Sequence, residues 1–308
     1  MRSKLSFWAA VSRAPFFTGS ALPVGLGASV AWYQTGHFHL GLFVLTLVAA
    51  VLFHAGANMA NDYYDHLTRA DDINPNYHTP FYGGSRMIQD GLMTPRATLI
   101  AALACFAIGS LIGVALTWLR GWPVLALGIF GGLSGFFYTA PPFKLSYRGW
   151  GELAIALDFG VLMVAGAEYV QTRAITTGGL VASIPVALLI LLVLYVNQFP
   201  DAPSDAQAGK RHLVVRLGTA RARFGVPLLF AGVYISILAA VATELAPGWC
   251  LVALLTVPLG AGASAIDLKF HNQPKRLPAA SAMTIAAHGL TTLLLIIGYA
   301  VGRTALAR

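Results

Sequence analysis

Nine long apolar runs constrain the fold of this 308-residue chain more than any other feature of its sequence. A helix needs about 20 apolar residues to cross the hydrocarbon core of a membrane. Only 10% of the residues are charged, whereas a soluble domain carries about a quarter. The sequence therefore predicts an all-α integral membrane protein, a single domain over 1–308, with helices near 14–33, 39–60, 97–119, 122–140, 152–170, 180–199, 223–243, 248–266 and 279–302.

The basic residues gather in alternate connections between these runs. Of the 20 Lys and Arg residues, 16 fall at the N-terminus and in the loops 61–96, 141–151, 200–223 and 267–278. By the positive-inside rule, this larger group marks the cytoplasmic side. We therefore expect a cytoplasmic N-terminus, an outside C-terminus and a location in the cell inner (cytoplasmic) membrane. Topology accounts for the net charge of +8, so no nucleic-acid partner is expected, and no obligate protein partner is evident.

Two short acidic motifs that resemble each other follow the second and sixth apolar runs. Each begins with Asn, has Asp four residues later, and has another Asp three or four residues after that. Their members are Asn58, Asn61, Asp62 and Asp65 in the first motif and Asn197, Asp201 and Asp205 in the second. Residues three or four apart lie on one face of a helical turn. The repeat predicts two walls of oxygen ligands that face each other at one membrane surface.

Carboxylate and amide oxygens favour a hard cation such as Mg²⁺ over zinc. Mg²⁺ usually binds a few carboxylates together with substrate phosphates, and each motif is followed by glycine and basic residues that suit an anion. These are Gly83-Gly84-Ser85-Arg86 and Gly209-Lys210-Arg211. Asp and Asn at helix ends are also common as caps or solvated loop residues, and this alternative stays open for Asp71, Asp72 and Asp90.

Together with further motifs, these residues resemble the UbiA superfamily of intramembrane aromatic prenyltransferases. The resemblance is greatest to the 1,4-dihydroxy-2-naphthoate polyprenyltransferase branch of menaquinone biosynthesis, and it covers nearly the whole chain. The further motifs are Ile88-Gln89 after Arg86, Tyr138-Thr139-Ala140-Pro141-Pro142, Tyr147-Arg148-Gly149 with Gly151-Glu152, and Val215-Arg216-Leu217-Gly218.

The resemblance implies a bundle of nine transmembrane helices around a central pocket, capped by cytoplasmic loops that carry the two Asp-rich motifs. It implies transfer of a polyprenyl group from prenyl diphosphate to an aromatic acid in contact with membrane lipid. The expected acceptor is 1,4-dihydroxy-2-naphthoate, with loss of CO₂, and two Mg²⁺ ions would bridge the motifs and the diphosphate. The expected catalytic metal ligands are Asp62 and Asp65 for one ion and Asp201 and Asp205 for the other, with Asn58, Asn61 and Asn197 as neutral ligands.

Four basic residues are candidates for binding the diphosphate oxygens: Arg86, Lys144, Lys210 and Arg211. Tyr138 is a candidate for shielding an allylic cation with its ring, and Arg13 for binding the acceptor's carboxylate or anchoring the membrane surface. Asp158 lies deep in the fifth apolar run, where a charge costs about 2.5–3.5 kcal/mol, and is a candidate for acceptor contact or proton handling. His54 and His288 are expected to be packed, hydrogen-bonded residues.

Two other interpretations stay open. A secondary transporter also has repeated halves and intramembrane charges, although here the carboxylates gather at one face rather than at the bilayer midplane. The same transfer chemistry could instead use 4-hydroxybenzoate, homogentisate or a tetrapyrrole as acceptor. Mg²⁺-dependent conversion of a labelled prenyl diphosphate to a lipid product would separate an enzyme from a transporter.

Overall fold

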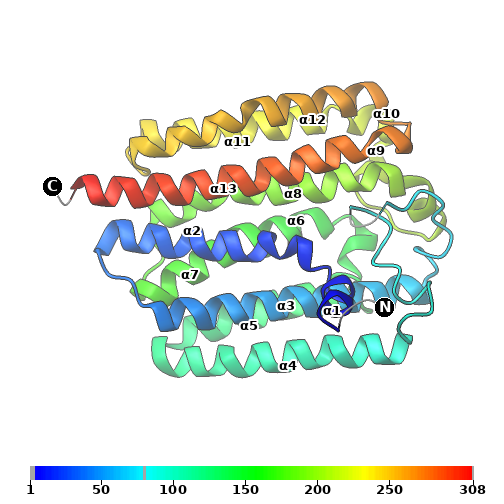
Figure 1. Cartoon of the computed structure of the whole chain (residues 1–308), viewed down its shortest axis with the longest axis horizontal. Helices are drawn as coiled ribbons and strands as arrows, with labels where there is room; N and C mark the ends of the chain where they lie inside the picture. Colours follow the sequence, from blue (N-terminus) through cyan, green and yellow to red (C-terminus); the bar gives the residue numbers. More distant parts are fainter. Residues whose placement is uncertain (1–3, 79–80, 307–308) are drawn as a thin grey trace.

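The computed structural model describes residues 4–78 and 81–306, and nearly all of its regular structure is helical (Figure 1). The α-helices are α1 (Lys4–Val11), α2 (Thr18–Thr35), α3 (Leu40–Leu67), α4 (Pro95–Arg120), α5 (Trp122–Phe137), α6 (Gly151–Ile155), α7 (Met163–Thr172), α8 (Thr177–Gln207), α9 (Leu213–Leu217), α10 (Thr219–Ala222), α11 (Gly225–Ala242), α12 (Val257–Phe270) and α13 (Pro278–Leu306). Tighter or wider helical turns form η1 (Ala14–Phe17), η2 (Leu145–Arg148), the π-helical η3 (Ala156–Leu162), η4 (Gly248–Thr256) and η5 (Pro274–Arg276).

Within residues 4–78 and 81–306, eight helical segments, counted together with the short turns that continue them, are long and apolar enough to cross a membrane. They are Ala14–Thr35, Leu40–Leu67, Pro95–Arg120, Gly151–Thr172, Thr177–Gln207, Thr219–Ala242, Gly248–Phe270 and Pro278–Leu306. Each overlaps one of the predicted apolar runs, so the prediction of an all-α membrane bundle is confirmed. The remaining run corresponds to α5, which has only 16 residues, and a ninth crossing therefore stays a prediction.

Large apolar side chains remain exposed on the outer helices. Leu111 and Trp118 on α4 are 70% and 86% exposed, and Leu228 on α11 is 73% exposed. Contiguous apolar surface of this kind is unfavourable in water and natural in contact with lipid tails. The exposed faces therefore agree with a membrane environment for these helices.

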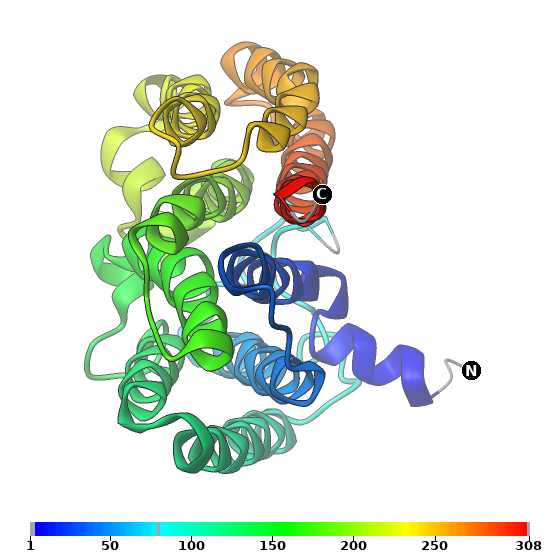
Figure 2. The ribbon, with the colours of Figure 1, turned by 90° about the vertical axis from the view of Figure 1, so that its left-hand side faces the viewer.

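The long helices run side by side along one axis, and α2 lies between the α11–α13 group and the α3–α5 group in the end-on view (Figure 2). α2 packs against α3, α7, α8 and α13. Gly27 makes the contact with α7 close, because a Cβ atom there would lie 2.1 Å from the carbonyl oxygen of Val164. Small residues permit such close approach between membrane helices.

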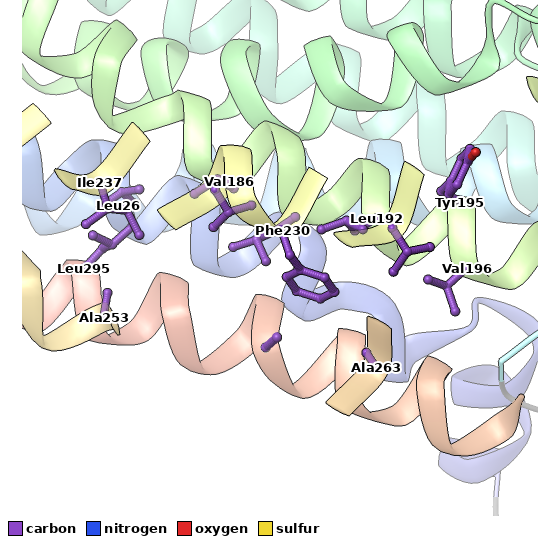
Figure 3. Close-up of a cluster of buried hydrophobic side chains, with 14 of the residues drawn as sticks. Leu26, Val186, Leu192, Tyr195, Val196, Phe230, Ile237, Ala253, Ala263 and Leu295 are labelled. Carbon is purple, nitrogen blue, oxygen red and sulfur yellow. The ribbon is translucent and has the colours of Figure 1, made fainter. Parts of the chain in front are cut away.

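A cluster of buried hydrophobic side chains joins α8, α11 and α13 (Figure 3). Leu192 on α8, Phe230 on α11 and Leu295 on α13 belong to it, and each is no more than 4% exposed. Close packing of this kind leaves little freedom for an individual helix to shift. The cluster therefore fixes α8, whose last turns carry the second acidic motif.

All five segments that the charge pattern assigns to one side lie together at one end of the bundle, and α13 ends at the other (Figure 1). The contacts that join these segments are Arg13 to Asp62, Asn74 to Asp201, Tyr82 to Pro274 and Arg211 to Tyr147. Arg2 and Arg308, which also enter the charge count, lie outside the described residues. The segments that carry most of the Lys and Arg residues therefore lie at the same end of the bundle, as the charge pattern predicts.

The two acidic motifs lie in helices rather than in the loops that the resemblance implied. α3 continues to Leu67 and α8 to Gln207, several residues beyond the predicted runs 39–60 and 180–199. Asp62 and Asp65 are buried there although their side chains are acidic, because the connecting segments at this end cover them. Hydropathy therefore placed the helix ends too early.

Candidate active site

The first acidic motif occupies one face of the last turns of α3. Asp62 and Asp65 are buried there, and the side-chain amide of Asn58 donates to the carbonyl oxygen of Ser12 at 3.0 Å. The guanidinium of Arg13 donates to a carboxylate oxygen of Asp62 and so ties the N-terminal segment to the motif. Arg13 has a φ of 55°, a left-handed conformation that is uncommon outside glycine and often found at functional sites.

Asp65 lies at the centre of a hydrogen-bond network that links α3 to the segment after α5. Its Oδ1 accepts from the hydroxyl of Tyr147 at 3.0 Å, and its Oδ2 accepts from Nδ2 of Asn61 at 3.0 Å. The same Nδ2 atom of Asn61 donates to Oγ1 of Thr139 at 2.8 Å. Two motifs recognised in the sequence, around Thr139 and Tyr147, therefore position the first acidic motif.

The second acidic motif faces the loop that follows α3. Oδ1 of Asp201 accepts from Nδ2 of Asn74 at 2.6 Å, and its Oδ2 accepts from the backbone N–H of Gly83 at 3.3 Å. Gly83 has a φ of 82°, and a Cβ atom there would lie 2.3 Å from Cβ of Tyr77, so this turn requires glycine. Oδ1 of Asn197, one helical turn earlier, is buried and has no hydrogen-bond partner among the described residues.

Lys210 joins the two motifs. Its Nζ lies 2.7 Å from Oδ2 of Asp65 and 3.6 Å from Oδ1 of Asp205, while the other carboxylate oxygen of Asp205 lies 3.1 Å from Nε2 of His212. Burial alone would lower the pKa of Lys210, but the charges of Asp205 and Asp65 raise it well above its ordinary value. The structure thus brings the motifs of α3 and α8 within reach of one charged side chain.

Asp71 is a site residue for which the sequence left a capping role open. It is 7% exposed and lies so close to Gly84 that a Cβ atom there would be 2.3 Å from its Oδ2. Burial and the negative charges of Asp65 and Asp62 raise the pKa of Asp71 to about 8. Burial and the neighbouring carboxylates therefore both disfavour a charge on Asp71.

These side chains line a polar cavity of about 230 Å³. Of the site residues predicted from the sequence, the following line this cavity: Arg13, Asn58, Asn61, Asp65, Tyr138, Asp158, Asn197, Asp201, Asp205 and Lys210. Asp71 and Asn74 also line it, and no local pattern singled out Asn74, because its role comes from the fold of the loop. Asp62 is not one of the residues that line the cavity, and its carboxylate pairs with Arg13.

Three of the four basic residues predicted to bind the diphosphate do not line the polar cavity. Nη1 of Arg86 donates to the backbone oxygen of Asp71 at 2.8 Å, and its guanidinium lies 4.3 Å from the ring centroid of Tyr77. Lys144 is half-buried with its Nζ 5.3 Å from the ring centroid of Tyr147, and Arg211 is exposed. A diphosphate role for these three residues stays a prediction, whereas Lys210 lines the cavity.

A second cavity, of about 160 Å³, is apolar and lies between α3, α4, α5, η3 and α7. The two cavities share five lining residues, which we call the waist: His54, Ala57, Gly135, Asp158 and Phe159. As expected, His54 is packed and hydrogen-bonded, since its Nδ1 lies 2.7 Å from Oγ of Ser20. His288 is packed as well, but its Nε2 has no partner within the described part of the chain.

The residues around the polar cavity fit a hard divalent cation that is bound together with a phosphate. In the described part of the chain, no three His, Cys, Asp or Glu side chains lie close enough to hold a metal ion by themselves. Mg²⁺ commonly binds through only one or two carboxylates and completes its coordination with substrate phosphates and water. The buried amide oxygen of Asn197, which has no hydrogen-bond partner among the described residues, and the carboxyl group of Asp71, which lies among other carboxylates, are groups that such a cation would satisfy.

Comparison with known proteins decides the family. The model of the UbiA prenyltransferase family matches residues 20–288. The chain belongs to this family. It is 34% identical over 248 residues to a 1,4-dihydroxy-2-naphthoate octaprenyltransferase of Mycobacterium tuberculosis. The aligned residues cover 80% of this chain and 78% of that relative. It is 26% identical over 294 residues to a 2-carboxy-1,4-naphthoquinone phytyltransferase of Synechocystis, over 95% of this chain and 92% of the relative.

The fold agrees with this assignment to the UbiA family. The solved structure of a UbiA homolog from Archaeoglobus fulgidus, bound to GPP and Mg²⁺, matches with a TM-score of 0.67 at 17% identity. The match covers 96% of this chain and 99% of that one. The protein is therefore a multi-pass membrane prenyltransferase, and the resemblance of its sequence motifs to the UbiA family is confirmed.

Proposed function

We propose that this UbiA prenyltransferase transfers a polyprenyl group from a prenyl diphosphate to 1,4-dihydroxy-2-naphthoate, with loss of CO₂. One observation carries the proposal: Lys210 joins both acidic motifs at a polar cavity that shares its waist with an apolar one. A prenyl diphosphate has the same two parts, an anionic head and a hydrocarbon tail. The acidic motifs would hold the head through a cation, and the apolar cavity would receive the start of the tail.

The choice of a naphthoate acceptor rests on the relatives. The Mycobacterium tuberculosis and Synechocystis proteins are both named for naphthalene-ring acceptors that carry a carboxyl group. Arg13 lines the polar cavity beside the first motif and has a buried Nε atom without a hydrogen-bond partner among the described residues. A guanidinium in this position is suited to binding the carboxylate of such an acceptor.

Mg²⁺ is the cation that the site supports best. The acidic side chains of the two motifs would hold it, Asp62 and Asp65 from α3 and Asp201 and Asp205 from α8, and we propose one ion for each pair. The amide oxygens of Asn58, Asn61 and Asn197 would serve as neutral ligands, and the carboxylate of Asp71 would be a further charged one. When bound, Mg²⁺ stabilises the negative charge that develops on the leaving diphosphate.

The protein's own groups prepare the site for departure of the diphosphate. Lys210 is largely buried and charged, so its ammonium can approach an anionic oxygen with little loss of hydration at that moment. Tyr138 lines the polar cavity, where its ring could shield an allylic cation from water. The covering loops keep the acidic residues largely buried, which strengthens every electrostatic contact inside.

We propose that the end of the bundle that holds the site faces the cytoplasm, with the C-terminus outside. The excess of Lys and Arg in the segments at that end supports this orientation. A prenyl diphosphate whose tail lies in the inner membrane could then enter with its head already at the cytoplasmic surface. Labelling of single cysteines placed after residue 212 and after residue 245 with an impermeant reagent tests the orientation in intact cells.

The decisive experiment for the proposed function is an acceptor panel with one fixed donor. Purified protein in lipid would receive a labelled prenyl diphosphate, Mg²⁺ and one aromatic acid at a time, and the organic phase would be analysed for product. We expect a prenylated, decarboxylated naphthalenediol from 1,4-dihydroxy-2-naphthoate and no product in EDTA. Faster product formation from 4-hydroxybenzoate or homogentisate would refute the naphthoate assignment, and uptake of label without any product would favour a transporter.

A further inference from the structure

We propose that Asp158 accepts a hydrogen bond from a ring hydroxyl of the aromatic acceptor and thereby helps to select that acceptor. This inference rests on the proposed function and adds a specificity-determining residue to the same site. It starts from a single buried carboxyl group at the waist between the two cavities.

The local structure holds Asp158 firmly at the waist. Asp158 is 8% exposed and lies in η3, a π-helical stretch, and wide turns of this kind are frequent at functional sites. Gly160 packs this stretch against α8, because a Cβ atom there would lie 2.4 Å from Cα of Ala187. The contact leaves little room for the backbone of η3 to move away from α8, so Asp158 stays at the waist.

One oxygen of this carboxyl group has no hydrogen-bond partner in the part of the chain that the structure describes. Ser134 of α5 lies near the group, but Oδ1 is buried without any hydrogen-bond partner among the described residues. Buried polar atoms in native proteins are nearly always paired, and an unpaired acceptor in apolar surroundings is costly. An oxygen of this kind in a ligand cavity calls for a donor on the ligand.

The position of the waist identifies the ligand group. The diphosphate end of the donor lies on the polar side and its tail on the apolar side, so the bond that breaks lies next to the waist. The ring that attacks this carbon must reach the same place. Among the five waist residues only His54 and Asp158 carry polar side-chain atoms, and Nδ1 of His54 is already paired with Ser20.

The donor's tail cannot satisfy Asp158, because a polyprenyl chain has no O–H or N–H group. A hydroxylated aromatic acid has one beside the ring carbon that is attacked. The carboxyl oxygen of Asp158 would then favour an acceptor with a hydroxyl at that position and disfavour one without it, since the latter leaves the oxygen unpaired again.

A cycle that pairs protein variants with acceptor analogues tests this inference. We would measure dissociation constants, in Mg²⁺ with an unreactive thiodiphosphate donor, for 1,4-dihydroxy-2-naphthoate and for its two monohydroxy analogues. The proteins are the wild type, Asp158→Leu, which removes the acceptor atom, and Asp158→Asn, which keeps the shape. Asp267→Asn is the matched control, because Asp267 is a fully buried acid on α12 outside both cavities.

We expect Asp158→Leu to weaken binding of the dihydroxy acid by roughly 10- to 100-fold and Asp158→Asn by less, with Asp267→Asn unchanged. The same substitutions should leave the affinity for one monohydroxy analogue, the one that lacks the contacted hydroxyl, within about twofold of the wild type. A uniform loss for all three ligands, or no loss, would overturn the inference. Binding of the thiodiphosphate alone should be unaffected throughout.

The two proposals fail in different ways. If the wild type binds and converts another hydroxylated aromatic acid instead, the naphthoate assignment is refuted, and the same cycle with that acid and its deoxy analogue tests Asp158. If the wild type converts the naphthoate and the cycle shows no coupling to Asp158, the proposed function stands and this inference is refuted.

Discussion

Replacement of Lys210 with Met should destabilise the metal-free protein and make its stability depend more strongly on Mg²⁺. The Nζ atom of Lys210 lies 2.7 Å from Asp65 and 3.6 Å from Asp205, and the three side chains are only 12%, 3% and 13% exposed. Removal of one partner from a buried ion pair costs about 3–5 kcal/mol, because the remaining charge is left unpaired. Met keeps most of the length and the apolar stem of lysine, so the loss should come from the charge.

Mg²⁺ should recover much of this loss. In the wild type the ammonium of Lys210 already neutralises part of the negative charge of the carboxylates. In Lys210→Met this charge is not neutralised, so Mg²⁺ is attracted more strongly. Ligand binding stabilises a fold in proportion to the logarithm of concentration over dissociation constant, so tighter binding gives a larger shift. We therefore expect a greater Mg²⁺-dependent rise in melting temperature for the variant than for the wild type.

The assay is thermal unfolding in detergent, with EDTA and then with increasing Mg²⁺. Lys269→Met is the control, because Lys269 is exposed and its Nζ lies against the ring of Phe270. Its melting temperature should match that of the wild type in both conditions. A Lys210→Met protein as stable as the wild type in EDTA, or with an equal Mg²⁺ shift, would refute the idea that Lys210 compensates a shared carboxylate site.

Two further predictions follow from single residues. The pKa of Asp71 is raised from 3.8 to about 8, so the folded protein binds this proton more tightly than the unfolded chain and stability in EDTA should fall as pH rises through that range. Asp71→Asn should flatten this part of the melting-temperature profile, and an unchanged slope would contradict the assignment. Gly131 lines the apolar cavity with open space where a Cβ would be, so Gly131→Leu should fold normally yet shift product formation toward shorter prenyl donors. Gly289→Leu, also into open space but outside both cavities, should leave the chain-length preference unchanged.

The apolar runs were sufficient to predict the membrane helices, because a helix in contact with lipid must be apolar over one continuous stretch of sequence. The ends of α3 and α8 were predicted too early for the same reason. Their last turns carry Asn and Asp, which hydropathy reads as loop. In the folded chain these turns stay helical because other segments cover them and pair with their charges.

The doubled Asn and Asp spacing was sufficient to predict that the two motifs face each other, since it repeats at equivalent helix ends. The partners of those motifs were not predictable in the same way. Asn74 and Asp71 reach the site only because the loop after α3 folds back on it, with Gly83 and Gly84 allowing the close approach. Such contacts depend on tertiary structure and leave no periodic signal in the sequence.

The central claim is that the two acidic motifs act together on one diphosphate through Mg²⁺. The most direct measurement is the Mg²⁺-dependent affinity for a prenyl thiodiphosphate in the wild type, Asp65→Asn, Asp201→Asn and the double variant. We predict that either single substitution removes most of the Mg²⁺-dependent binding and that the second adds little, since the two residues serve one ligand. Losses that simply add, or binding that is equally tight in EDTA, would contradict the account.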